Sequence, residues 1–314
     1  MNQFPGGVWP VMLTPFTETG AVDFEALEKL TEWYIENGVN GLFAVCQSSE
    51  MFSLTLEERL AIARTVVQCA DGRVPVIASG HVSDREADQI EEVNRMAETG
   101  VKAVILITNR FAAEDEDDEI WLQRCTAFLD KINPDIPLGF YECPYPYKRL
   151  ISLENLRICS EMNRFYFLKD TCCNLKLIQK RLELLRGTNL KLYNANSATL
   201  LDSLRYGASG FSGVMANFHP RLYVYLCNHM HDKEVDYLQD FLGTAALIER
   251  QYYPVNAKYH LQKFENLPLT TYCRKLDDRG LTETYQKEIA MLNELTQEIA
   301  KHYKENSEKG EKMV

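Results

Sequence analysis

The feature that most constrains the fold is an alternation of eight short β-rich runs with amphipathic helical stretches between residues 8 and 214. This alternation is typical of a (β/α)₈ TIM barrel, an α/β fold. The competing fold, a doubly wound open sheet, carries a glycine-rich phosphate loop after its first strand. Here the first run leads into Thr14-Pro15-Phe16-Thr17-Glu18, which offers no such loop, so we predict the barrel. The predicted strands are Val8–Pro15, Gly41–Cys46, Val74–Ser79, Ala103–Thr108, Leu138–Cys143, Tyr166–Asp170, Leu190–Asn194 and Gly210–Val214.

Helix start and stop signals separate these runs. Asp23 is an N-cap candidate before an apolar helical repeat, and Thr55 with Glu58 has the spacing of a capping box. Ser83 is expected to open the third helix, which should stop at Gly100. The helical period then continues beyond Pro220 almost to the end of the chain. We therefore predict two parts: a barrel over residues 1–220, and the last barrel helix with a C-terminal helical bundle over residues 221–314.

Charge and cysteine usage exclude several classes of protein. The net charge of −11 argues against nucleic-acid binding, which needs a basic face. No apolar run approaches the length of a membrane span, and the first residues lack the pattern of a signal peptide. The nine cysteines are scattered, odd in number and without metal-ligand spacing, which is typical of reduced thiols. We expect a cytoplasmic protein with no nucleic-acid or membrane partner and no metal.

Lys169 is the strongest candidate for a reactive group. It lies in the almost wholly apolar run Phe165-Tyr166-Phe167-Leu168-Lys169, which reads as a buried strand. Burial without a partner lowers the pKa of a lysine, and a neutral amine can form an imine with a carbonyl substrate. The alternative is a structural lysine that reaches solvent or pairs with Asp170.

Other polar side chains follow the predicted strands at the end where barrel enzymes place their active sites. Gln47, Ser48 and Ser49 follow the second strand, and Tyr141 ends the fifth. A phenol can carry protons for imine formation, and hydroxyl or amide groups can hold the carboxylate of a 2-oxo acid. The serines could instead cap a turn, and Tyr141 could be a packed aromatic. Such an imine needs no metal or organic cofactor, because the iminium itself is the electron sink.

At these positions the chain resembles the dihydrodipicolinate synthase / N-acetylneuraminate lyase family of class I aldolases. The family's Gly-Thr/Ser-Thr-Gly-Glu motif corresponds to Cys46-Gln47-Ser48-Ser49-Glu50, and its Tyr-Asn-x-Pro motif to Tyr141-Glu142-Cys143-Pro144. Its Schiff-base lysine falls on Lys169, and its Gly-x-Ile-Ser-Val-x-x-Asn-x-x-Pro segment resembles residues 210–220. The resemblance covers nearly the whole chain.

The resemblance implies a Schiff base between Lys169 and pyruvate or a related 2-oxo acid, with Tyr141 as the proton shuttle. It implies reversible aldol cleavage or condensation with an aldehyde, in a homo-oligomer that is a dimer or a tetramer. Glu50 is expected to be structural and to orient the turn after the second strand. The substrate-binding residues expected on this basis are Ser48, Gln47, Ser49, Arg110, Asn196, Ser197 and Met215.

Three departures from the family pattern concern the second substrate. The tyrosine that the synthases extend into a neighbouring subunit is Phe111 here, and their arginine after the fifth strand is Pro146. The acidic pair of the lyases is replaced by Asn196 and Ser197. We therefore expect a different aldehyde partner, with Arg110 as a candidate contact for an anionic one.

Two other functions stay open on the sequence. The run Glu50-Met51-Phe52-Ser53-Leu54 resembles 5-dehydro-4-deoxyglucarate dehydratases, which act on a deoxy-keto sugar acid through the same imine. A non-catalytic 2-oxo-acid binding protein on the same scaffold is the alternative from another class.

Overall fold

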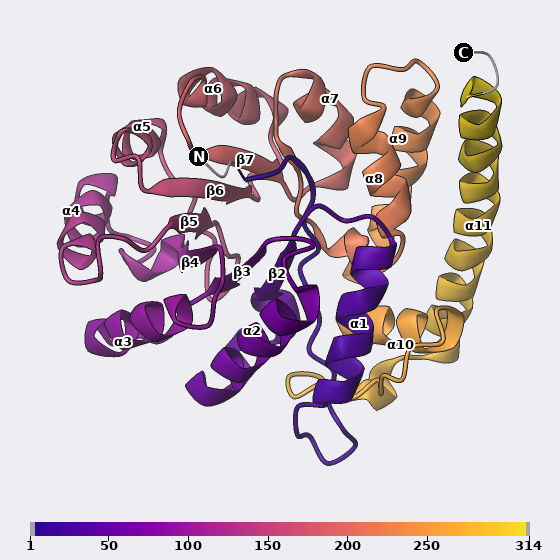
Figure 1. The fold of residues 1–314 in the computed structure, drawn as a ribbon, viewed down its shortest axis with the longest axis horizontal. Helices are drawn as coiled ribbons and strands as arrows, with labels where there is room; N and C mark the ends of the chain where they lie inside the picture. Colours follow the sequence, from indigo (N-terminus) through magenta and orange to yellow (C-terminus); the bar gives the residue numbers. More distant parts are fainter. Residues whose placement is uncertain (1–3, 312–314) are drawn as a thin grey trace.

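The computed structural model describes residues 4–311, and the side chains of residues 4–303. Eight parallel strands form one sheet in the order β1-β8-β7-β6-β5-β4-β3-β2, with the helices arranged outside it (Figure 1). Every strand that the sequence predicts is present, and the (β/α)₈ class is confirmed. The strands are β1 Gly7–Val8, β2 Leu42–Val45, β3 Val76–Ser79, β4 Ala103–Ile107, β5 Leu138–Tyr141, β6 Phe165–Asp170, β7 Lys191–Asn194 and β8 Gly210–Phe211.

Backbone hydrogen bonds outside the named strands complete the barrel between its first and second strands. Met12 N donates to Phe43 O and Phe43 N to Pro10 O, each at 3.0 Å. The regular part of β1 is much shorter than predicted, because Pro10 has no N–H to donate to a ladder. At the other neighbour of β1, a Cβ added to Gly210 would lie 1.8 Å from the carbonyl oxygen of Gly7. Only glycine allows this close approach of β8 to β1.

Two of the predicted helix starts are confirmed, and a third is wrong. Asp23 accepts a hydrogen bond from Ala26 N at the start of α1, and Thr55 forms the predicted capping box at α2. Ser83 does not cap the third helix, which starts at Glu86; its hydroxyl donates to Glu92 instead. The helices are α1 Phe24–Glu36, α2 Leu56–Ala70, α3 Glu86–Ala97, α4 Asp118–Leu129, α5 Leu153–Glu161, α6 Leu175–Leu185, α7 Leu200–Arg205, α8 Pro220–Asn228, α9 Val235–Ala245, α10 Val255–Phe264 and α11 Glu283–Glu311.

Aromatic rings fill the inside of the barrel near β1, β2, β6 and β7. Phe167 stacks on Tyr193 with ring centroids 4.1 Å apart, and Trp9 and Phe43 pack edge-on against Phe167. Rings of this size bury much apolar area and pack with few voids. The interior is therefore a packed core, and polar groups are left to the carboxyl ends of the strands.

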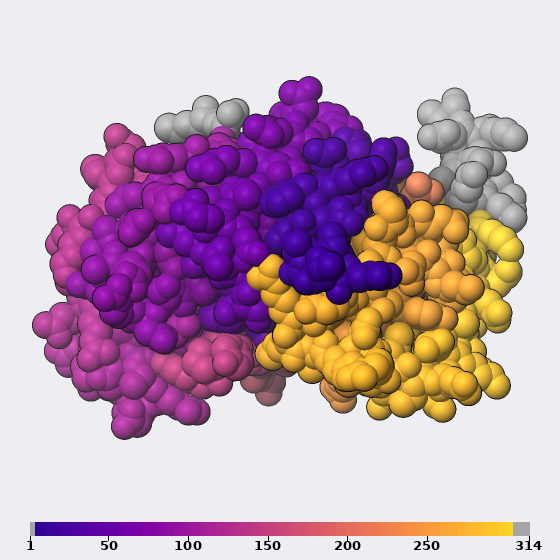
Figure 2. Space-filling model, turned by 90° about the horizontal axis from the view of Figure 1, so that it is seen from below, coloured from indigo at the N-terminus to yellow at the C-terminus, as the bar shows by residue number. Residues whose placement is uncertain are grey.

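The C-terminal segment returns to the N-terminal one. Figure 2 shows atoms of the first helix region, in indigo, directly against the orange C-terminal part. Trp33 Nε1 donates to Glu265 at 2.9 Å, and Thr270 donates to Phe16 O at 2.6 Å. In Figure 1 α11 lies at the edge of the molecule, beside α8 and α9. No helix in residues 4–311 is both long and apolar enough to cross a membrane.

Candidate active site

Lys169 lies on β6 between β5 and β7, paired in register with Tyr141 and Tyr193. The residue is only 4% exposed, and its Nζ lies 4.4 Å from the centroid of the Tyr141 ring. Within the described residues no carboxylate is in ion-pair distance of this amine. Burial therefore lowers the pKa of Lys169, which the nearby Cys46, Cys143 and Glu249 only partly oppose. This is the environment in which a lysine loses its proton readily and becomes a nucleophile.

Asp170, the alternative partner for this lysine, pairs elsewhere. Successive side chains of a strand point to opposite faces, so Asp170 and Glu142 face away from Lys169 and Tyr141. Both carboxylates bind the guanidinium of Arg181 on α6, and all three side chains are fully buried. Arg181 also donates to Ile151 O at 2.8 Å. We call Glu142, Asp170 and Arg181 the buried charge cluster; it joins β5, β6 and α6 directly behind the lysine.

Tyr141 ends β5, and its ring faces the amine of Lys169. The side chain is 4% exposed, and burial raises the pKa of its hydroxyl well above the usual value. The hydroxyl therefore keeps its proton at neutral pH and can donate it to a developing oxyanion or accept one in return. The thiols of Cys46 and Cys143 both influence the pKa values of Tyr141 and Lys169.

The turn after β2 is a short 3₁₀ segment, η1 Gln47–Ser49, and its three side chains have different surroundings. Ser49 is tied to the backbone of Cys46, accepting from its N–H at 2.6 Å and donating to its O at 2.7 Å. This local bonding favours a structural role. Gln47 accepts a bond from the Cys143 thiol at 3.3 Å, which brings the β2 and β5 ends together. Ser48 is 6% exposed.

Glu50 holds this turn in place. Its backbone is left-handed (φ 59°), and its carboxylate binds Lys258 Nζ at 3.1 Å on α10. The same carboxylate accepts the backbone N–H groups of Arg274 and Lys275 at 2.7 and 3.0 Å. These contacts fit the structural role expected for Glu50, and they attach the β2 turn to the C-terminal segment.

Of the four other predicted binding residues, three have local partners and the fourth is buried. Arg110 pairs with Asp84 at 2.6 Å and lines a cleft of about 640 Å³ whose lining does not include Lys169, Tyr141 or Ser48. Asn196 accepts the Thr199 N–H at 3.1 Å, and Ser197 bonds the Tyr223 hydroxyl at 2.6 Å. Met215 is fully buried in η5 Val214–Asn217, after β8. Among the predicted residues, Tyr141 thus faces Lys169 and Gln47 contacts Cys143 after β5, whereas Arg110 lines a cleft whose lining contains none of these.

Two titratable residues of the C-terminal segment were not predicted from the sequence: Glu249, and Tyr253, whose hydroxyl accepts from Asn217 Nδ2 at 3.0 Å. Glu249, in η6 Ala246–Arg250, is partly buried, and burial raises its pKa while the charge of Lys169 opposes the rise. Tyr253 follows it, and burial raises the pKa of its hydroxyl well above the usual value. Neither residue follows a predicted strand, so the barrel rule gave no signal for them.

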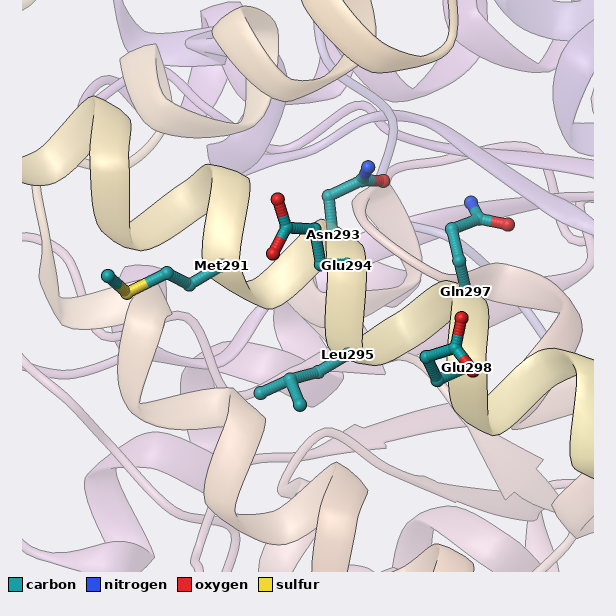
Figure 3. A pocket seen from close by; sticks show the side chains of 6 residues that line it. All are labelled: Met291, Asn293, Glu294, Leu295, Gln297 and Glu298. Carbon is teal, nitrogen blue, oxygen red and sulfur yellow. The ribbon is translucent and has the colours of Figure 1, made fainter.

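A second hollow, of about 730 Å³, lies along α11 and contains no residue of the strands. Figure 3 shows its lining side chains, all from one helix, with Met291 and Leu295 on the same side. These two side chains are 49% and 58% exposed.

Within the described residues no group of three His, Cys, Asp or Glu side chains could hold a metal ion. The candidate site is therefore the buried Lys169 amine facing the Tyr141 phenol, with the Cys143 thiol and Gln47 bonded to each other beyond the end of β5.

Comparison with known proteins identifies relatives of this chain. The model of the Dihydrodipicolinate synthetase family matches residues 4–292. A 4-hydroxy-tetrahydrodipicolinate synthase of Jannaschia sp. (strain CCS1) is 30% identical over 69% of this chain and 72% of its own length. One from Clostridium perfringens (strain 13 / Type A) is 27% identical over 86% and 92%. The fold matches a dihydrodipicolinate synthase from Acinetobacter baumannii, solved in complex with pyruvate, with a TM-score of 0.83 at 22% identity over 94% and 99%.

Proposed function

This chain belongs to the dihydrodipicolinate synthetase family of enzymes and has its class I aldolase scaffold, and we propose that it forms a Schiff base between Lys169 and pyruvate or a related 2-oxo acid. The imine would serve reversible aldol cleavage or condensation with an aldehyde. One observation carries the proposal: a buried lysine without a carboxylate partner faces a buried phenol, with Nζ 4.4 Å from the ring centroid. The pyruvate complex of the Acinetobacter baumannii relative supports the choice of 2-oxo acid.

The proposed reaction uses groups of this chain alone. The neutral amine of Lys169 adds to the keto carbon, and the carbonyl oxygen takes a proton from the Tyr141 hydroxyl. The amine nitrogen returns a proton to the Tyr141 oxygen, the hydroxyl then takes this proton and leaves as water, and an iminium and the Tyr141 phenolate remain. The phenolate takes a methyl proton to give an enamine. The enamine carbon forms the new bond to the aldehyde carbonyl carbon, and the aldehyde oxygen takes the proton from Tyr141. Hydrolysis of the imine then releases the product and restores the amine.

We propose that the aldehyde is neutral or hydroxylated rather than anionic. Lys148 donates to Thr171 O at 2.8 Å, and Arg149 donates to Ala113 O and Glu116 O at 2.8 Å each and pairs with Asp118, so both side chains contact other groups of the protein. Pro146 stands where the synthases have an arginine. An anionic aldehyde would therefore lack that compensating cation.

Reduction with borohydride tests the proposal. Incubation with pyruvate and borohydride should add one reduced pyruvyl group, which peptide mass spectrometry should map to Lys169. Lys169→Ala should abolish the adduct, and Lys191→Ala, which removes a lysine bonded to Phe4 O at the far end of the neighbouring strand, should keep it. An adduct that is absent, or that survives in Lys169→Ala, would show that this lysine is not the nucleophile.

Two further expectations, on the oligomeric state and the cellular location, belong to the same proposal. We propose a homo-oligomer, a dimer or a tetramer, in the cytoplasm. The family resemblance implies the oligomer, and the reduced state of all nine cysteines is in keeping with a cytoplasmic location. Mass measurement of the native protein in solution tests the oligomer.

A further inference from the structure

Two contacts join the loop after β2 to the loop after β5 across the carboxyl ends of the strands. The Cys143 thiol donates to Gln47 Oε1 at 3.3 Å, and the rings of Phe52 and Tyr145 lie with their centroids 4.9 Å apart. In the sheet, β3 and β4 lie between β2 and β5, so each contact passes over the ends of two strands. Cys143 is fully buried, whereas Tyr145 is 44% exposed. We therefore call the Gln47–Cys143 contact the inner bridge and the Phe52–Tyr145 contact the outer bridge.

These bridges divide the strand ends of the barrel into two groups. The ends of β3 and β4 lie on one side, and those of β6, β7, β8 and β1 lie on the other. Lys169 belongs to β6, so its amine lies on the larger side, where it faces the Tyr141 ring. Arg110 follows β4, and it lines the cleft of about 640 Å³ together with Ser83, which follows β3. The bridges thus stand between the proposed nucleophile and the Arg110 cleft.

The two bridges face different spaces. Both residues of the outer bridge, Phe52 and Tyr145, line the Arg110 cleft, and neither residue of the inner bridge does. Cys143 lies only two residues beyond Tyr141, whose ring faces the Lys169 amine. A molecule held at Lys169 would therefore meet the inner bridge before the outer one.

The half of the inner bridge that follows β5 is fixed in place. Asn109 Nδ2, which follows β4, contacts the carbonyl oxygens of Cys143, Tyr145 and Tyr147 at 3.0, 2.9 and 2.6 Å. This loop can move aside only if it gives up those bonds, which is costly for buried carbonyl groups. The Gln47 side chain, in contrast, has the Cys143 thiol as its only hydrogen-bond partner within residues 4–303. The position of the glutamine therefore depends on this thiol.

We propose that the inner bridge limits the length of the substrate, because it closes the way from Lys169 to the Arg110 cleft. In an imine formed with an aldol product, the carbon chain beyond the keto carbon carries the part that comes from the aldehyde. A long tail directed toward β3 and β4 would meet Gln47 and Cys143, and it would not reach Arg110. This inference rests on the proposed imine at Lys169 and adds that the aldehyde is short.

Borohydride trapping with 2-oxo acids of increasing length tests the proposal. Pyruvate, 2-oxobutanoate, 2-oxopentanoate and 2-oxohexanoate share the keto acid and differ in the length of an apolar tail. The measured quantity is the half-saturating concentration of 2-oxohexanoate divided by that of pyruvate, so a general loss of imine formation cancels. We expect a high ratio in the unsubstituted protein. Gln47→Ala should lower the ratio at least about tenfold, the usual effect of making room for methylene groups in a pocket. Cys143→Ala should lower it by a smaller factor, because Gln47 stays but loses its partner.

Two variants show whether the contact itself sets the limit. Cys143→Ser keeps a donor for Gln47, so its ratio should stay near that of the unsubstituted protein. Cys172→Ala is the matched control, because Cys172 also lies two residues beyond a strand and its thiol bonds Asn174 O at 3.6 Å within its own loop. It should leave the ratio unchanged.

Three results would overturn the proposal. They are an unchanged ratio in Gln47→Ala, a ratio that falls as far in Cys143→Ser or Cys172→Ala as in Cys143→Ala, and equal trapping of 2-oxohexanoate and pyruvate by the unsubstituted protein. Absence of any pyruvate adduct in the unsubstituted protein would instead refute the lysine chemistry on which the inference rests.

Discussion

The buried charge cluster gives the sharpest prediction about stability. Replacement of Arg181 by methionine keeps most of the side-chain volume and removes the only cation that contacts Glu142 and Asp170 among the described residues. Both carboxylates then remain buried without a counter-charge. Arg181→Met should therefore lower the free energy of unfolding strongly, although no residue of the proposed reaction is changed.

The size of this loss in the free energy of unfolding follows from the groups that the Arg181 guanidinium contacts. It donates to Glu142 at 2.6 and 3.1 Å, to Asp170 and to Ile151 O at 2.8 Å, and all three cluster side chains are 0% exposed. Removal of one partner of a buried ion pair typically costs about 3–5 kcal/mol. Two carboxylates lose their partner here, so the upper part of that range is expected. A typical domain is stable by only about 5–15 kcal/mol, and the loss should be large in any denaturant titration.

The loss should also depend on pH with a defined sign. Burial raises the pKa of Glu142, and the guanidinium of Arg181 opposes the rise. Without Arg181 the folded-state pKa of Glu142 rises further above its value in the unfolded chain. A group shifted in this direction favours folding below its unfolded pKa, and that contribution is lost as pH rises through the folded pKa. The deficit of Arg181→Met should therefore be larger at pH 8 than at pH 5.

Denaturant unfolding at both pH values is the assay, and Arg157→Met is the control. Arg157 pairs with Glu154 and Glu161 on the exposed face of α5, where such pairs contribute less than about 1 kcal/mol. The control should unfold within about 0.5 kcal/mol of the unsubstituted protein. A loss below about 1 kcal/mol in Arg181→Met, or a loss that does not change with pH, would refute this reasoning about the cluster.

Two further predictions concern turnover. Tyr141→Phe removes one hydroxyl and little volume, so it should fold normally and lose about 10²–10⁴-fold in turnover, and near-normal turnover would exclude Tyr141 from the mechanism. In coupled assays with pyruvate, aspartate semialdehyde should be a poor partner compared with neutral hydroxylated aldehydes, because Pro146 stands where the synthases have an arginine. Efficient condensation with aspartate semialdehyde by the unsubstituted protein would contradict it.

Much of the fold could be predicted because the barrel repeats a local pattern. Short apolar runs and capping residues such as Asp23 and Thr55 are set within a few residues of each other, and they mark most elements correctly. Ser83 failed as a cap because Glu92, nine residues later, competes for its hydroxyl. Such a contact forms only when helix α3 packs beside the loop that precedes it, and no local sequence pattern predicts this packing.

The candidate site was predictable only in part for the same reason. Lys169 is conspicuous because a cation interrupts an apolar strand, and Tyr141 follows from its place at a strand end. Tyr253 lies in a segment between helices, and only tertiary packing brings its hydroxyl within 3.0 Å of Asn217, after β8. Arg110 followed a strand as expected, yet its pairing with Asp84 directs it into another cleft.

The anchoring of Glu50 by residues more than 200 positions later has a consequence for the order of synthesis. A nascent chain leaves the ribosome from its N-terminus, so all eight strands can be complete before Lys258 and residues 274–275 emerge. Until then the turn that carries Ser48 is not held by these contacts, and the Glu50 carboxylate has no cation with which to pair in the interior. A chain that ended after the eighth strand would lack these contacts to Glu50, and the turn after β2 would not be held in place. This turn would thus be fixed in a single late step, when the last quarter of the polypeptide packs against the first.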